Sequence, residues 1–523
     1  MKRVFCLLLA LVLLTGCGQR KNIEIDHNQV TVSISTEPET LDPCLGWGHG
    51  TTPLVQSTLV EYKQDMTFAN DLATDYRLSE DRLVWTFDIR NDVKFTDGEA
   101  LTAEDVVFTF ETAKAAQSAV DLSYVENVEA VDEDTVAVTL SQPNSSFLNT
   151  VATLGIVPEH AYGAGYGDAP IGSGPYKFVQ WNKQEQLILE ANEDYYGEVP
   201  AIKRVNIVFQ TEDAAFAAVK AGQVDVALTA ATLGKHVIDG YRLQTVTTVD
   251  NRGFTLPMSP NEGKTTEDGH PIGNDVTCHL EIRQAMAYAV DRQMLAEVAL
   301  NGFATPCYSV NDGMPWNNPE TVIETDVDYA KQLLSDHGWA DSDGDGIVEK
   351  DGVKAAFTVI YPSGDSVRQA VAMAAAQQLK EIGIAITVEG TSWDDIAKRM
   401  FSEAVCMGWG SSTPQESYYL FHSSGMWKDD YYNPEGYSNP TVDGYLEAAL
   451  SAATTEEAYE YWRKAQWDGE TGTAMQGDCP WVWLVNVQHL YYVRDGLDIG
   501  RQQLHAHGAS MPLIQNIEDW RWE

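Results

Sequence analysis

Hydrophobic and polar residues alternate along several short segments of the chain, a pattern typical of β-strands. The alternation predicts strands over residues 30–35, 83–89, 93–95 and 128–140, the last of these as a hairpin. Other segments repeat apolar residues every three to four positions, as one face of a helix does. Thr102 with Asp105 predicts a capped helix start, and a second helix is expected to run from Asp213 to Gly222.

The later part of the chain continues this alternation of strands and helices. A strand at 355–361, a helix at 365–382 and a strand at 384–389 predict a βαβ unit, and strand character returns at 481–493. The loop at 163–175 is rich in Gly and Pro and is predicted to be a crossing point between domains. With 523 residues, the chain is expected to form an α/β protein with more than one domain.

The N-terminus has the features of an export signal. Residues 1–3 are a short basic start, and an apolar run of eleven residues follows at 4–14, too short for a permanent membrane span. The run ends in Leu14-Thr15-Gly16-Cys17, which resembles the bacterial lipobox. This resemblance implies a lipoprotein signal peptide at 1–16, lipidation of Cys17 and a polar tether at 17–28. The alternative is an ordinary signal peptide that contains a cysteine.

Composition excludes some classes of function. Lys and Arg total 34 against 77 Asp and Glu, a net charge of −43, which argues against nucleic-acid binding. We find no Gly-x-Ser-x-Gly, His-Glu-x-x-His or complete phosphate-binding loop, so an enzyme is not expected. Five cysteines follow Cys17 in the chain; Cys278 with Cys307 is one option for a disulfide, and free thiols are the other.

A series of separated motifs carries a family resemblance. These motifs are Leu41-Asp42-Pro43, FTDGEALTAEDVVFTFE (95–111), IGSGPYKF (171–178), NEDYYG (192–197), AGQVDVA (221–227), IRQAMAYAVDR (282–292) and YSNPTVD (437–443). In order and spacing they resemble the family 5 solute-binding proteins of ABC importers, the peptide- and nickel-binding group. The resemblance covers nearly the whole mature chain.

The resemblance implies a type II bilobal periplasmic-binding-protein fold with an extra subdomain in the first lobe. The first lobe would comprise 29–62, an inserted subdomain at 63–165, a second segment at 166–254 and a C-terminal segment at 481–523, and the second lobe 255–480. It also implies an extracytoplasmic monomer, held to the membrane only by lipid, that delivers its solute to an ABC permease. No cofactor is required. Di- or oligopeptides are the first expectation for the ligand, and nickel or a metal chelate is the alternative.

Candidate ligand-binding residues follow from segments that approach the cleft in relatives. In the first lobe they are Trp47 and His49, within a glycine-rich GWGHG. In the second lobe they are Trp409, Ser411, Glu416, Tyr418, Tyr419 and His422. Dipeptide-binding relatives carry an Asp shortly after the Gly-Trp pair; this chain does not, and Glu416 is the candidate substitute. Arg252 is a candidate partner for a ligand carboxylate. Core packing is the alternative for Trp409, and a surface ion pair for Arg252.

Two clusters are candidates for metal binding. His505 and His507 lie on one side of an extended segment and could complete a nickel site with His49 or His422; two solvated loop histidines are the alternative. Asp341, Asp343, Asp345 and Gly346 match positions 1, 3, 5 and 6 of a calcium-binding EF-hand loop. Position 12 is Gly352, so Glu349 or Asp351 would have to supply the closing ligand. The alternative is a solvated acidic turn.

Overall fold

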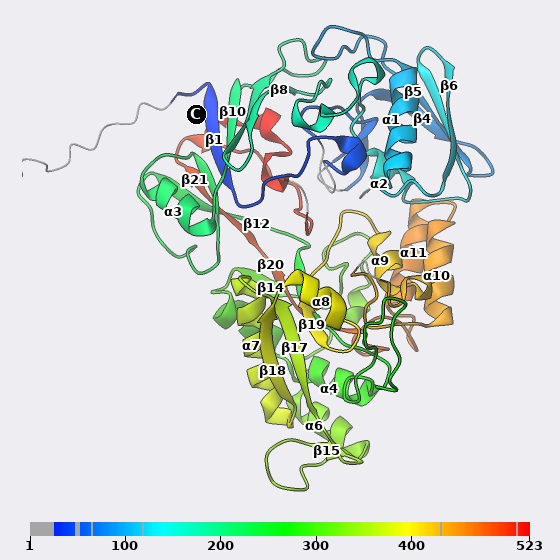
Figure 1. Cartoon of the computed structure of the whole chain (residues 1–523), viewed down its shortest axis with the longest axis vertical. Coiled ribbons are helices and arrows are strands. Elements are labelled where there is room, and N and C mark those ends of the chain that lie inside the picture. Colours follow the sequence, from blue (N-terminus) through cyan, green and yellow to red (C-terminus); the bar gives the residue numbers. More distant parts are fainter. Residues whose placement is uncertain (1–25, 48–52, 64–65, 118–119, 429–430, 509–510) are drawn as a thin grey trace, which may run out of the picture.

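The computed structural model describes residues 26–47, 53–63, 66–117, 120–428, 431–508 and 511–523. Two lobes lie one above the other along the longest axis, and a subdomain extends beside the first lobe (Figure 1). Separate clusters of buried apolar side chains fill the second lobe, the subdomain and the first lobe. Each part is therefore stabilised by a core of its own.

A seven-stranded mixed sheet forms the described part of the first lobe. In spatial order its strands are β12 (Tyr241–Val246), β21 (His489–Arg494), β11 (Val226–Thr229), β1 (Gln29–Ile34), β10 (Arg204–Phe209), β9 (Gln186–Ala191) and β8 (Tyr176–Asn182). β1 pairs in parallel with β10 and β11. Helix α3 (Glu212–Lys220), capped by Thr211, connects β10 to β11. The strand predicted at 30–35 and the helix predicted at 213–222 are confirmed with slightly different ends.

The described part of the second lobe contains a six-stranded sheet. Its order is β14 (Ala304–Pro306), β20 (Trp481–Val487), β13 (Asn251–Thr255), β19 (Ala404–Met407), β17 (Ala356–Pro362) and β18 (Ala385–Thr391). β17 and β18 pair in parallel, with helix α7 (Ser366–Leu379) between them in the chain. Asp365 caps α7 by accepting from the Arg368 N–H. The predicted βαβ unit is confirmed.

The chain crosses between the two sheets near residues 247–250 and again at Gln488. The strand predicted at 481–493 is in fact two strands, because β20 pairs with β13 and β14, whereas β21 pairs with β11 and β12. The predicted lobe boundaries after residues 254 and 480 therefore differ from the sheets, in which β13 and β20 belong to the second lobe. Both strands are rich in apolar residues, and the polar residues Asn486, Gln488 and His489 interrupt the apolar run where the chain changes sheet.

The subdomain is an antiparallel sheet covered by a helix. In the described residues its strand order is β4 (Ala73–Leu78), β5 (Val84–Ile89), β7 (Thr135–Leu140) and β6 (Val125–Asp132). Helix α1 (Ala103–Ala116) begins with the predicted capping box of Thr102 and Asp105. The short helix α2 (Phe147–Val151) and the hairpin of β2 (Val60–Tyr62) and β3 (Phe68–Asn70) complete this part.

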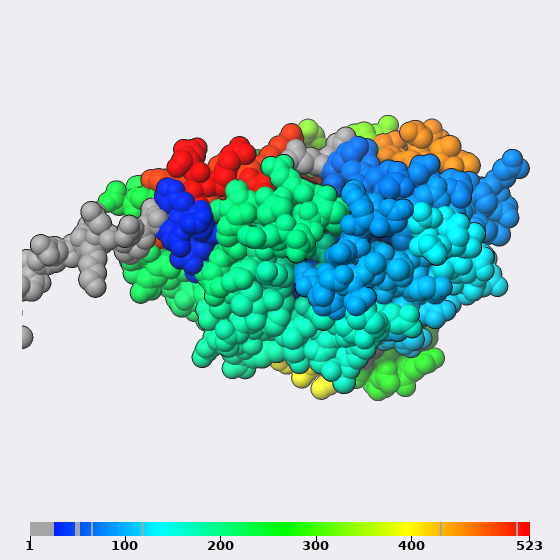
Figure 2. Space-filling model, turned by 90° about the horizontal axis from the view of Figure 1, so that it is seen from above, coloured from blue at the N-terminus to red at the C-terminus, as the bar shows by residue number. Residues whose placement is uncertain are grey.

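Most of the remaining helices belong to the second lobe. They are α4 (Leu280–Ala289), α5 (Arg292–Met294), α6 (Val327–Asp336), α8 (Trp393–Arg399), α9 (Glu416–Phe421), α10 (Pro440–Leu450) and α11 (Thr455–Gln466). Small hairpins are formed by β15 (Glu349–Lys350) with β16 (Val353–Lys354) and by β22 (Leu497–Asp498) with β23 (Arg521–Trp522). Ile517 and Trp520 of the C-terminal segment are buried in the first-lobe core, and this segment lies along one edge in Figure 2. The five described cysteines, Cys278 and Cys307 among them, are free thiols.

Candidate ligand-binding site

One cavity, which we call the subdomain cavity, lies between the subdomain and the second lobe and has a volume of about 700 Å³. Tyrosines and uncharged polar side chains form most of its wall: Tyr62, Lys114, Gln117, Val120, Asp121, Leu122, Ser123, Asn149, Thr150, Thr153, Ser411, Ser412, Thr413, Gln415, Tyr419 and Tyr432. Its two charged groups already have partners. The Lys114 ammonium donates to the Val125 carbonyl, and the Asp121 carboxylate accepts from the Tyr419 hydroxyl at 2.6 Å.

A second cavity, which we call the hinge cavity, lies where the chain crosses between the lobes and has a volume of about 470 Å³. Its wall contains Glu212, 228–231, Asp250, Arg252, Leu300, Phe303, 362–368, Trp393 and 487–490. Both lobes contribute, because β11 and β21 belong to the first sheet and β17 to the second. Charged groups of both signs line this cavity, in contrast to the subdomain cavity.

The wall of the hinge cavity contains two buried arginines. Arg252 is paired with Asp250, and Arg368 with Asp365 at the start of α7. The Nε atom of each guanidinium is buried and has no hydrogen-bond partner among the described residues. Burial lowers the pKa of Arg368, and the nearby Arg252 charge lowers it further. The two guanidinium groups and the first N–H groups of α7 favour negative charge here, whereas the carboxylates of Asp250, Asp365 and Glu212 in the same wall oppose it.

The carboxylate of Asp250 joins the segments that cross between the lobes. It accepts from Arg252, from His489 Nε2 at 3.2 Å and from His507 Nδ1 at 2.5 Å. Burial would raise the pKa of Asp250, but Arg252 and His507 outweigh it and hold the pKa well below the usual range. His505 Nδ1 lies 3.0 Å from His489 Nδ1, and burial lowers the pKa of His505 to about 3. The predicted metal candidates His505 and His507 are therefore engaged with groups of the crossing segments.

The loop at 408–415 packs against the first crossing segment. A Cβ atom on Gly410, whose φ is +128°, would lie 1.5 Å from the Val249 carbonyl oxygen, so this close approach requires glycine. Trp409 stacks on Tyr432 with ring centroids 4.4 Å apart and contacts His507 at 6.2 Å. Trp409 itself lines neither cavity, but it contacts Tyr432 in the wall of the subdomain cavity and His507, which is bonded to Asp250 in the wall of the hinge cavity.

The other candidates of this segment divide into two groups. Ser411 and Tyr419 line the subdomain cavity. Glu416 is buried behind the loop and accepts from the Gly410 N–H at 3.1 Å, and burial raises its pKa to about 8. Tyr418 stacks on His422 at 4.3 Å, and His422 bonds Ser424 and Glu447 rather than His505 or His507.

The two first-lobe candidates, Trp47 and His49, give little information about the ligand-binding cleft. Trp47 is buried in the first-lobe core, and its Nε1 has no partner among the described residues. His49 and the lipidation candidate Cys17 lie outside the described residues.

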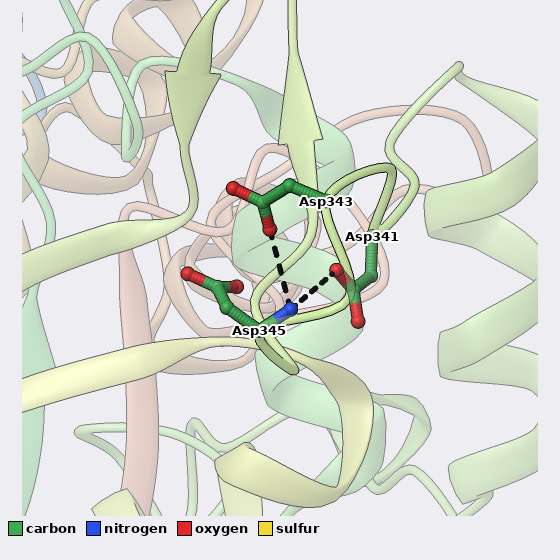
Figure 3. A group of neighbouring side chains, drawn as sticks. All are labelled: Asp341, Asp343 and Asp345. Atoms are coloured by element: carbon green, nitrogen blue, oxygen red, sulfur yellow. Dashed lines mark hydrogen bonds between the residues drawn. The ribbon is translucent and has the colours of Figure 1, made fainter.

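The acidic loop between α6 and β15 brings three carboxylates together. Asp341, Asp343 and Asp345 have oxygen atoms within 4.8 Å of one another, the one such group found in the described part of the chain (Figure 3). The Lys354 ammonium contacts Asp343 at 2.7 Å and also Asp345, so a cation of the chain itself already lies beside two of them. Glu349 accepts from the Ser342 N–H at 2.9 Å. Structural calcium stays a prediction.

Sequence reasoning missed Arg368, Asp121 and Asn149, which line the cavities. Arg368 lies in the first turn of a helix whose start was predicted, and a basic residue at a helix N-terminus is unfavourable unless an acidic partner or an anion compensates it. That conflict was a usable signal. Asp121 and Asn149 meet the second lobe only in the folded protein, and no local sequence pattern indicates these contacts.

Comparison with known proteins identifies the family. The profile of "Bacterial extracellular solute-binding proteins, family 5 Middle" matches residues 67–431. The chain belongs to family 5 of the bacterial extracellular solute-binding proteins. It is 32% identical over 490 residues to Protein XP55 of Streptomyces lividans, covering 90% of this chain and 85% of that protein. It is 29% identical over 429 residues to the oligopeptide-binding protein AppA of Bacillus subtilis, covering 77% and 76%.

Solved structures of the family share the fold. NikZ from Campylobacter jejuni, crystallised with Ni(L-His), matches with a TM-score of 0.79 at 24% identity over 95% of this chain and all of that one. The bilobal fold expected from the sequence is thereby confirmed. As a family 5 member, the chain is an extracytoplasmic solute-binding protein of the ABC-importer type and not an enzyme. Among its described residues, no helix is long and apolar enough to cross a bilayer.

Proposed function

We propose that this protein captures di- or oligopeptides between its lobes and delivers them to an ABC permease. The observation that carries the proposal is the pair of buried arginines, Arg252 and Arg368, whose side chains line the hinge cavity. A peptide ends in a carboxylate, which is the anion that guanidinium groups and a helix N-terminus bind well. The similarity to an oligopeptide-binding relative supports the same class of ligand.

The rest of a peptide would occupy uncharged surroundings. The subdomain cavity offers hydroxyl and amide groups from Ser411, Thr413, Gln415 and Asn149, and these can donate to or accept from peptide groups. Its volume of about 700 Å³ lies within the range of small-molecule sites. We infer that this cavity receives peptide side chains, with the carboxylate held in the hinge cavity.

A metal chelate is the alternative ligand. Chelates of nickel with amino acids also carry carboxylates, so the arginine pair suits them too. The fold similarity to NikZ, whose structure contains Ni(L-His), is consistent with this alternative. Against it, the Nδ1 atoms of His505 and His507 are bonded to His489 and Asp250, and His505 Nε2 is buried.

We further propose that the mature chain begins at a lipidated Cys17 and works as a monomer outside the cytoplasmic membrane. The tether at 17–28 would let the receptor reach its permease while the lipid alone contacts the bilayer. Radiolabelled palmitate should be incorporated into the wild-type protein in cells. A Cys17→Ala variant should incorporate none, and unchanged incorporation would contradict the anchor.

The ligand class is tested by native mass spectrometry of the unlipidated protein as purified, compared with its denatured mass. An added mass that fragments into amino acids supports the peptide proposal and gives the length. A nickel isotope pattern supports the chelate instead. If no mass is added, calorimetric titration with a mixed di- to nonapeptide pool decides: absence of heat would contradict peptide binding.

A further inference from the structure

The subdomain supplies the end cap of a second-lobe helix. Helix α10, all of whose residues are described, has no Lys or Arg in its last turn. As at every helix C-terminus, its last carbonyls lack the usual partners four residues later in the helix, and the Ala449 carbonyl accepts from the Ser451 and Ala452 N–H groups just beyond it. The Ser145 N–H donates to the Leu450 carbonyl at 2.8 Å and its hydroxyl to Ala449 at 2.9 Å, while Arg82 Nη1 donates to Ser451 at 2.7 Å. Three carbonyls of one lobe are thus capped from the other.

The charge of Arg82 also suits this position. A helix C-terminus carries partial negative charge, which a nearby cation stabilises. Figure 1 shows α10 and α11 below the subdomain, and in Figure 2 the orange region borders the blue region on the face shown. Because α10 lacks a basic residue of its own in its last turn, Arg82 is the cation that this end receives.

Two further contacts cross the same interface. The Tyr419 hydroxyl donates to Asp121 at 2.6 Å, and Asn149 Nδ2 donates to the Ser412 carbonyl at 3.3 Å. These four residues line the subdomain cavity, whereas Arg82 and Ser145 do not. The cap on α10 therefore acts on the cavity only by holding its two walls together.

We propose that the inserted subdomain is a latch that holds the second lobe closed over the subdomain cavity, with Arg82 and Ser145 as positioning residues. Each hydrogen bond between the subdomain and the second lobe joins polar groups that water can also satisfy. Separation of the two parts therefore exposes these groups at small net cost. A latch of this kind favours the closed form yet lets the lobes part for entry of solute. The proposal does not depend on whether the solute is a peptide or a chelate.

The test compares two variants of the unlipidated protein with the parent. The double variant Arg82→Gln with Ser145→Ala weakens the cap, and Arg77→Gln is the matched control, since Arg77 pairs with Asp88 inside the subdomain sheet. Small-angle X-ray scattering measures the radius of gyration. Hydrogen exchange measures opening at position 145 and, separately, in β5 and β7.

We expect the double variant to have a larger radius of gyration and an amide at position 145 that exchanges about tenfold faster. Exchange in β5 and β7 should stay at the parental rate, and the control should match the parent throughout. An unchanged radius with unchanged exchange at position 145 would overturn the latch. Faster exchange across the whole subdomain would also overturn it, because the residues would then serve only subdomain stability. If Arg82→Lys replaces Arg82→Gln in the double variant, part of the closed population should be restored.

Discussion

The two cavities use opposite chemistry to face a ligand. The hinge cavity is lined by Arg252, Arg368, Asp250, Asp365 and Glu212, and its two guanidinium groups keep unpartnered Nε atoms. The subdomain cavity is lined mainly by hydroxyl, amide and phenol groups, and its two charged groups are already bonded. The first can hold a charged end group that every member of a ligand class shares. The second can accept variable, uncharged parts.

This division explains how one receptor could bind many related solutes. A charged pair in a buried site is worth much more than an exposed one, so the end group supplies affinity. Hydroxyl and amide groups can act as donors or acceptors and adapt to several partners. Trp409 lies between the two regions, stacked on Tyr432 and in contact with His507. Substitutions in either cavity can test this division.

The largest effect is expected from Arg368→Gln. The change removes a buried charge that we assign to the ligand carboxylate, and losing one partner of such a pair costs about 3 kcal/mol, or roughly 100-fold in affinity. Calorimetry with the solute identified by mass spectrometry measures the loss. Arg399→Gln is the control, because Arg399 joins Glu389, Asp395 and Glu403 in a network outside both cavities. Equal affinities for the parent and Arg368→Gln would contradict the assignment of Arg368 to the ligand carboxylate.

Glu416→Gln should change the alkaline side of the stability profile. Burial raises the pKa of Glu416 to about 8, so its protonated form is favoured in the folded state. The stability it contributes is fully present below pH 4.5 and is lost as pH rises toward 8. The glutamine variant should therefore gain up to about 3 kcal/mol relative to the parent at pH 7. Urea unfolding at pH 5 and pH 7 measures the difference, and parallel profiles would contradict it.

His505→Gln should act on the acid side, in the opposite direction. Burial lowers the pKa of His505 to about 3, so the folded state keeps this ring neutral while the unfolded chain protonates it. The stability it contributes is present above pH 6.5 and is lost as pH falls toward 3, by roughly 2 kcal/mol at pH 5. The variant should flatten this limb in urea unfolding. Substitution of the exposed His337 by glutamine is the control, and an equal flattening there would refute the assignment.

Local patterns predicted much of the fold. The Thr102–Asp105 cap, the βαβ unit around α7 and the hairpin of β6 and β7 all depend on residues close together in the chain. The split of 481–493 between two sheets was missed, although the polar residues Asn486, Gln488 and His489 interrupt the apolar run at the crossing.

The sites were harder to predict because they depend on distant residues. Glu416 was the candidate for a cation because it follows the Gly-Trp pair, yet it is buried behind the loop. Asp121, 298 positions away from its partner Tyr419, is the carboxylate that lines the subdomain cavity. Arg252 was a candidate from the sequence, but Arg368 was not, although its place in the first turn of α7 was a usable signal.

The smallest effect is expected from Tyr419→Phe, which tests the uncharged cavity. The change removes the hydroxyl that donates to Asp121 at 2.6 Å but keeps the ring. Because solvent can reach the freed carboxylate, the cost should be about 1 kcal/mol, or roughly fivefold in affinity. Beyond an equal loss for every solute from the weaker contact with Asp121, affinity for solutes that differ only in an uncharged side chain should change by unequal amounts, whereas Arg368→Gln should weaken all of them alike. Equal losses for every solute with Tyr419→Phe would show that the two cavities do not divide the recognition.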